Sequence, residues 1–105
     1  MEERRLEPRI EANAPITMTP LAAVATRIHG SVVNVSGRGL KVHVDAPPKE
    51  RPAAGDVYRV QSGDDLMLCE VRHYQPVAEG VDLGFVILHW VNVGELSRLV
   101  KEFDR

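Results

Sequence analysis

Short runs in which apolar and polar residues alternate, separated by turns rich in glycine and proline, constrain the fold of this chain more than any other feature. The clearest run places Leu40, Val42 and Val44 at every second position, with charged or polar residues between them. Side chains of a β-strand point alternately to opposite faces, so this pattern is typical of a strand with one buried face and one wet face. It predicts antiparallel strands joined by short turns.

Similar runs predict about six strands in the middle of the chain. Residues 62–65 are expected to form a hairpin turn, and three prolines place residues 45–56 in a loop. Residues 21–26 stay ambiguous, because their alanines would also suit a turn of helix. The expected strands are residues 16–19, 27–36, 40–45, 57–61, 66–74 and 81–87.

The pattern changes its period near the C-terminus. Leu96, Leu99, Val100 and Phe103 recur there at helical spacing, with charged residues between them. We therefore expect one helix of about ten residues, which is short enough to depend on packing for its stability.

These elements fit a single mainly β domain that spans residues 1–105. A chain of this length buries one core but is too short for two. The predicted fold is a small antiparallel β-barrel of about six strands (residues 13–92), with a C-terminal α-helix (residues 93–105) against one opening of the barrel. Residues 1–12 carry charge and little periodicity, and we expect them to form a flexible arm.

Composition and charge exclude several classes of function. The formal net charge of −2 argues against broad DNA or RNA binding, which needs a basic field. No run of about eighteen apolar residues is present, so we expect no membrane insertion. Because the chain opens on Glu2 and Glu3 and holds Cys69 as its one cysteine, we expect a cytoplasmic protein in which Cys69 is a packing residue.

The residue types that support catalysis are present but are not arranged for it. The four histidines lie in separate expected strands without the spacing of a metal site, and His43 is expected on a wet strand face. Ser36 lacks the G-x-S-x-G frame of a nucleophile elbow, and Asp64 with Asp65 suits a turn better than a catalytic pair. We expect no enzyme activity, no metal site and no cofactor.

A cluster of arginines near the N-terminus is the first candidate for a binding site. Arg4, Arg5 and Arg9 carry guanidinium groups, which bind phosphate with a bidentate fork and stack on nucleobases. The same arginines, mixed with glutamates, would alternatively form a solvated tail with weak surface ion pairs.

The second candidate is Asn34-Val35-Ser36-Gly37-Arg38-Gly39. Asn34 and Ser36 share one face of the expected strand, opposite Val33 and Val35, which we expect in the core. An asparagine amide suits the mixed donor and acceptor edge of guanine, and the serine adds a hydroxyl. Gly39 would allow a tight turn with positive φ. Alternatively, these residues mark a β-turn and nothing more, because Asn, Ser and Gly all favour turns.

Together the two motifs resemble the paired signature of the PilZ domain, RxxxR followed by (D/N)xSxxG. Residues 3–10 resemble that family's arginine segment, including the proline before the final arginine. Residues 34–39 match the second motif, with Asn34 at a position that is often Asp. Residues 81–86 are similar to the family's glycine-containing last strand, and a helix is expected to follow it.

The resemblance implies a receptor for cyclic di-GMP, a bacterial second messenger with two guanines and two phosphates. It implies that Arg5 and Arg9 hold phosphates and stack on guanine, while Asn34 and Ser36 bind a base. Arg4 would contact a second ligand molecule, because some relatives bind an intercalated pair. The predicted ligand site is Arg4, Arg5, Arg9, Asn34, Ser36 and Gly39, with Arg38 as a weaker candidate.

The resemblance also implies how the protein works. We expect ligand to order the N-terminal arm across the barrel and thereby to change the surface offered to an effector protein that is still unidentified. In this family the outputs include motility and exopolysaccharide synthesis. The alternative is a PilZ-like interaction module that acts without ligand.

Overall fold

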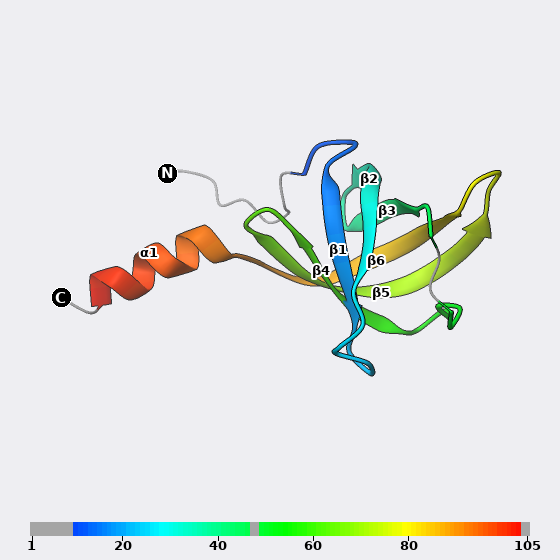
Figure 1. Ribbon diagram of the computed structural model, residues 1–105. Helices are drawn as coiled ribbons and strands as arrows, with labels where there is room; N and C mark the ends of the chain where they lie inside the picture. Colours follow the sequence, from blue (N-terminus) through cyan, green and yellow to red (C-terminus); the bar gives the residue numbers. More distant parts are fainter. Residues whose placement is uncertain (1–9, 47–48, 104–105) are drawn as a thin grey trace.

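The computed structural model describes residues 10–46 and 49–103, which form six strands and one helix. The strands close into an antiparallel barrel in the order β1-β2-β3-β6-β5-β4. Figure 1 shows these strands and the helix that follows them. This confirms the predicted six-stranded barrel, whereas residues 1–9 of the predicted arm, with Arg4, Arg5 and Arg9, lie outside the described residues. The elements are β1 (Pro15–Pro20), β2 (Ile28–Ser36), β3 (Gly39–Val44), β4 (Val57–Ser62), β5 (Asp65–Pro76), β6 (Val81–Asn92) and α1 (Val93–Phe103).

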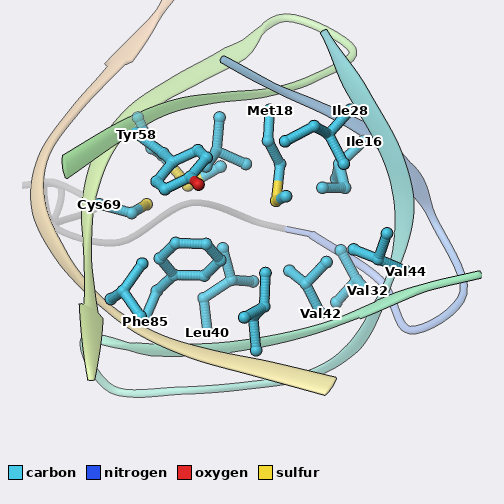
Figure 2. Close-up of a cluster of buried hydrophobic side chains, with 14 of the residues drawn as sticks. Ile16, Met18, Ile28, Val32, Leu40, Val42, Val44, Tyr58, Cys69 and Phe85 are labelled. Atoms are coloured by element: carbon cyan, nitrogen blue, oxygen red, sulfur yellow. The ribbon is translucent and has the colours of Figure 1, made fainter. Parts of the chain in front are cut away.

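The inward side chains of all six strands fill the barrel with a mainly aliphatic core (Figure 2). Tyr58 and Phe85 meet edge to face inside it, with their ring centroids 5.9 Å apart. Cys69 is completely buried, and this burial raises the pKa of its thiol to about 12. The prediction that Cys69 is a packing residue is confirmed. Other fully buried side chains are Met18, Val32, Val42, Val44, Val60, Met67, Val71 and Leu83.

The ambiguous segment 21–26 is neither helix nor strand. It forms successive turns between β1 and β2, in which the Ala23 amide donates to the Pro20 carbonyl and the Thr26 amide to the Ala23 carbonyl. Leu21 and Val24 are exposed on these turns. Pro20 cannot donate to a strand ladder, which is consistent with β1 ending there.

The helix forms where the period predicted it, but its predicted position is wrong. It projects away from the barrel beyond the end of β6 (Figure 1), and Leu96, Leu99 and Val100 are 49–54% exposed. The reason is local, because β6 runs to Asn92 and the helix begins at the next residue, without a loop to fold it back. The Asn92 side chain caps the helix by accepting a hydrogen bond from the Glu95 amide at 2.9 Å.

Among the described residues, no helix is both long enough and apolar enough to cross a membrane.

Candidate ligand-binding site on the outer face of the barrel

The outer face of β2, β3, β6 and β5 carries the second sequence motif. The strand register aligns Asn34 with Lys41, Lys41 with Gly84 and Gly84 with His73, which gives one row of outward positions across four strands. Ser36 begins the next row, where it pairs with Gly39. The sequence prediction that Asn34 and Ser36 share the wet face therefore agrees with the structure, and both side chains are exposed.

The two rows form part of the wall of a pocket of about 430 Å³. Three of the predicted site residues, Asn34, Ser36 and Gly39, line this pocket together. Within residues 10–46 and 49–103, the side chains of Asn34 and Ser36 make no hydrogen bond. An asparagine amide and a serine hydroxyl can each donate to and accept from a ligand. The other lining residues are Leu40, Lys41, Arg72, His73, Gln75, Asp82, Gly84 and Phe85.

Two β-bulges change which side chains face outward near this pocket. In β2 the register shifts between Val32 and Asn34, so Val32 takes the buried position and Val33 is 41% exposed. The prediction that Val33 lies in the core is therefore wrong, while Val35 packs against the core as expected. Strict alternation breaks at a bulge, and the sequence alone gave no sign of where the extra residue would fall.

The second bulge lies in β5. The register shifts between Val71 and His73, and both Arg72 and His73 are exposed, whereas a regular strand would have turned one of them inward. This bulge brings a guanidinium and an imidazole to the pocket. Sequence reasoning missed both residues, because the position of a bulge in β5 could not be predicted from alternation.

The predicted role of Gly39 as a positive-φ turn residue is wrong. The positive φ falls on Gly37, at 58°, while Gly39 is already the first residue of β3 and pairs with Ser36. The pairing leaves only Gly37 and Arg38 as the loop of the hairpin, so the residue with positive φ lies two positions earlier than predicted. Gly39 lines the pocket, and a Cβ atom there would crowd the Ser36 carbonyl oxygen at 3.3 Å.

Arg38, the weaker candidate, faces another strand. Its Nη1 donates to the Ile87 carbonyl at 3.1 Å, and its own carbonyl accepts from the Ile87 amide at 2.7 Å. Both bonds fasten the β2–β3 turn to β6. Arg38 does not line the pocket, and the structure gives it a role in holding the turn.

Gly84 supplies part of the pocket floor. A Cβ atom at this position would lie 3.2 Å from the His73 ring and 3.3 Å from the His73 Cβ. Any side chain larger than hydrogen would therefore push on His73 and fill the hollow between β3 and β5. This gives a physical reason for a glycine in the last strand of the barrel.

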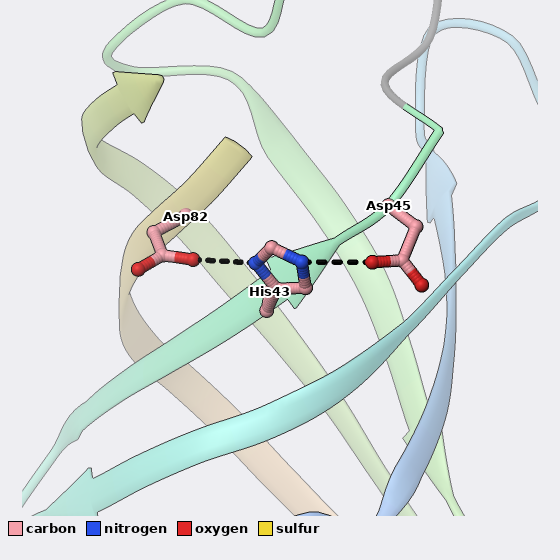
Figure 3. A network of polar contacts seen from close by, with 3 residues as sticks. All are labelled: His43, Asp45 and Asp82. Atoms are coloured by element: carbon pink, nitrogen blue, oxygen red, sulfur yellow. Dashed lines mark hydrogen bonds and ion pairs between the residues drawn. The ribbon is translucent and has the colours of Figure 1, made fainter. Parts of the chain in front are cut away.

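A histidine between two carboxylates borders the pocket (Figure 3). His43 Nδ1 lies 2.8 Å from Asp82 Oδ1, and His43 Nε2 lies 2.9 Å from Asp45 Oδ1. The hydrogen bond to Asp82, followed by that to Asp45, raises the pKa of His43 above its ordinary value of 6.5. The sequence placed His43 on a wet strand face but did not reveal Asp82 beside it, because that contact depends on the register between β3 and β6.

The chain just after the predicted arginine segment lies along β2. Ile10 packs against the core, the Asn13 amide donates to the Val32 carbonyl at 2.7 Å, and the Val32 amide donates to the Ala14 carbonyl at 2.9 Å. Asn13 and Ala14 therefore lie along β2 at Val32, which is two residues before Asn34 in the sequence.

A second and larger hollow, of about 1050 Å³, lies between the β1–β2 turns and the β3–β4 loop. It is lined by apolar residues such as Ile28 and Val57, with Arg27 and Lys49 among its charged residues. None of the predicted site residues lines it. No cluster of three metal-ligating side chains occurs in the part of the chain that the structure describes.

Comparison with known families gives one match. The family model for the PilZ domain matches residues 3–102, which include both motifs and all six strands. No curated protein and no solved structure matches the chain.

Proposed function

Because the chain belongs to the PilZ domain family, we propose that it is a receptor for cyclic di-GMP. The ligand binds across the outer face of β2, β3, β6 and β5, between the pocket and the N-terminal arginines. The protein acts in the bacterial cytoplasm as an adaptor, without catalysis and without a cofactor. Its output is a contact with an effector protein in a pathway such as motility or exopolysaccharide synthesis.

The observation that carries this proposal is the convergence of Asn34, Ser36 and Gly39 on one pocket. The Asn34 amide offers a donor and an acceptor to the edge of a guanine, and the Ser36 hydroxyl offers one more donor. Lys41 and Arg72 add two cations to the same walls, which suits a ligand with two phosphates. The net charge of −2 makes such a local cationic site more selective than a basic surface would be.

The arginines complete the site in this proposal. Arg5 and Arg9 hold phosphates and stack on guanine, and Arg4 contacts a second ligand molecule if a pair binds. The backbone contacts of Asn13 and Ala14 with Val32 support this, because they hold the residues that follow the arginine segment against β2, close to Asn34 in the sequence.

The affinity follows from two opposing contributions. Each charge-assisted hydrogen bond to phosphate contributes roughly 1.5–3 kcal/mol, while ordering each residue of a mobile arm costs roughly 1–2 kcal/mol. Several such bonds, together with stacking of guanidinium on guanine, leave a dissociation constant of about 1 μM. Ligand binding is thereby coupled to arm ordering, which is the change an effector would recognise.

The exposed face of α1 favours a second candidate function. Leu96, Leu99 and Val100 form an apolar stripe that the barrel does not cover, and such stripes commonly bind other proteins. A ligand-independent interaction module would use this helix and leave the pocket empty. The two candidates differ in one property, which is whether the purified chain binds the dinucleotide.

Isothermal titration calorimetry of cyclic di-GMP into the full chain tests the proposal. We expect micromolar binding to the unaltered protein and loss of at least about tenfold in affinity for Ser36→Ala and for Arg5→Ala. Ser97→Ala and Arg98→Ala, on the exposed surface of α1, are matched controls that should leave the affinity unchanged. Absence of heat and of thermal stabilisation with the unaltered chain would favour the ligand-independent module.

A further inference from the structure

One wall of the proposed ligand pocket carries a carboxylate that is hydrogen-bonded to a histidine. Asp82 on β6 lines the pocket, and its Oδ1 lies 2.8 Å from His43 Nδ1 on β3. On its other side, the His43 ring contacts Asp45 at 2.9 Å. Figure 3 shows the imidazole between the two carboxylates. The side chains of His43 and Asp82 are partly buried, whereas that of Asp45 is largely exposed.

This geometry requires a protonated imidazole for both contacts to be hydrogen bonds. An ionised carboxylate only accepts, and a neutral imidazole donates from one nitrogen alone. With His43 protonated, the three side chains carry a net charge of about −1, and loss of the proton brings this to about −2. It also removes one of the two hydrogen bonds that orient the ring.

The residues that neighbour His43 and Asp82 in the sheet do not supply a positive charge in place of the His43 proton. Across β2 the register places the neutral Ser31 opposite His43, and beyond Asp82 on β5 it places the neutral Gln75. Lys41, the other charged side chain on β3, lies in the next outward row, and His73 on β5 lies in the same row as Lys41. Arg72 on β5 also lines the pocket, but its guanidinium lies 3.9 Å from the carboxylate of Glu70. Among the described residues, the ion pair of Asp82 is therefore the one with His43.

We propose that His43 is a positioning residue for Asp82 and that its proton makes the binding of cyclic di-GMP depend on pH. The proposal rests on the proposed function, because it assigns a regulatory residue to that same pocket. A dianionic ligand is repelled by a bare Asp82 carboxylate on the pocket wall, and the His43 imidazolium reduces this repulsion. Binding is tight when His43 is protonated and weaker when it is not.

Linkage fixes the direction of the effect. If ligand binds the protonated form more tightly, it must in turn raise the pKa of His43 by the same free energy. The two carboxylates already raise this pKa above 6.5 in the free protein. Affinity is therefore highest at and below about pH 6.5, declines through the His43 titration and is flat above it. Because the charges act through partly solvated surroundings, the total fall is about three- to tenfold.

The test is a series of calorimetric titrations of cyclic di-GMP into the full chain from about pH 5.5 to about pH 9. Three variants accompany it: His43→Gln removes the titrating group, Asp82→Asn removes the charge it compensates, and His73→Gln removes the other pocket histidine. The unaltered chain and His73→Gln should lose affinity with rising pH, whatever affinity His73→Gln starts from. The His43→Gln and Asp82→Asn variants should show a flat profile. NMR detection of the His43 ring should show that ligand raises its pKa by about half a unit to one unit.

Each outcome of this series decides between the proposals. Binding by the unaltered chain with a flat pH profile, or a slope that persists in His43→Gln, overturns the role of His43 and leaves the receptor function standing. A slope that disappears in His73→Gln assigns the proton to His73 and also overturns it. No binding at any pH overturns the receptor function and with it this regulation.

Discussion

The inner and outer sides of strands β3 and β6 differ in what their residues contact. On the inner side Val42 pairs with Leu83, and both side chains are completely buried. One residue away on the outer side Lys41 pairs with Gly84, and both line the open pocket. The effect of a substitution in β3 or β6 should therefore depend on whether its side chain points inward or outward. Inward substitutions should lower the stability of the fold, and outward substitutions should weaken ligand binding.

The largest expected effect belongs to the inner row. Leu83→Ala removes a completely buried side chain and leaves a cavity, so we expect the free energy of unfolding to fall by about 2–5 kcal/mol. Chemical denaturation followed by circular dichroism measures it. Under conditions where the variant is still folded, its affinity for cyclic di-GMP should stay within about threefold of the original. A loss in the free energy of unfolding of less than about 1 kcal/mol would contradict the claim that the inner row determines stability.

Asn34→Ala tests the outer row. Its side chain is exposed and has no hydrogen bond within the described ranges, so the free energy of unfolding should change by no more than about 0.5 kcal/mol. Affinity for cyclic di-GMP should fall about 10- to 100-fold, because a base-binding amide is lost. Calorimetry and denaturation of the same preparation give both numbers. A stability loss comparable to that of Leu83→Ala would erase the distinction between the rows.

The His43 network lies on the outer side but also affects stability, and so it sharpens the comparison. The pKa of His43 in the folded protein is raised above its ordinary value of 6.5. As the pH rises past 6.5, the folded protein therefore keeps a proton on His43 that the unfolded chain loses. The stabilisation is therefore fully present below about pH 6.5 and is lost as the pH rises through the folded pKa. Denaturation at a series of pH values should show this decline in the original chain and not in His43→Gln. An identical decline in both chains would assign it to other groups.

The smallest effect is expected in the helix. Leu99 is 53% exposed on α1, so Leu99→Ser should change the free energy of unfolding by about 0.5 kcal/mol or less. Thermal denaturation of the two chains measures the difference. A loss above about 2 kcal/mol would mean that the apolar face of α1 is packed against the barrel or a second chain in solution.

The inner rows were predictable from the sequence, and the outer rows were predictable only in part. Period-two alternation identified Leu40, Val42 and Val44 as buried, because an inward position tolerates little else. It failed at Val33, where a bulge adds a residue without changing the composition of the strand. The turn residues led to a second error, because positive φ was predicted for Gly39 and is found at Gly37. In a turn with two glycines, the sequence does not show which of them takes the positive φ.

The helix and the histidine network show a second limit of sequence reasoning. Helical spacing predicted α1 correctly, but an apolar stripe does not say what covers it, and the barrel does not cover this one. The contact between His43 and Asp82 joins residues on two strands far apart in the chain, so it required the register between β3 and β6. The arginines of the candidate site lie outside the described residues, and their role stays a prediction.

The most direct test of the proposed site is chemical-shift mapping of cyclic di-GMP on the isotope-labelled chain. We predict that the amide signals of Asn34, Ser36, Lys41 and Gly84 move on titration, together with those of the N-terminal arginines. Signals from the second hollow, such as that of Gly55, should stay in place. Shifts centred on the second hollow, or no shifts at all, would contradict the claim that the outer face of β2, β3, β6 and β5 is the ligand site.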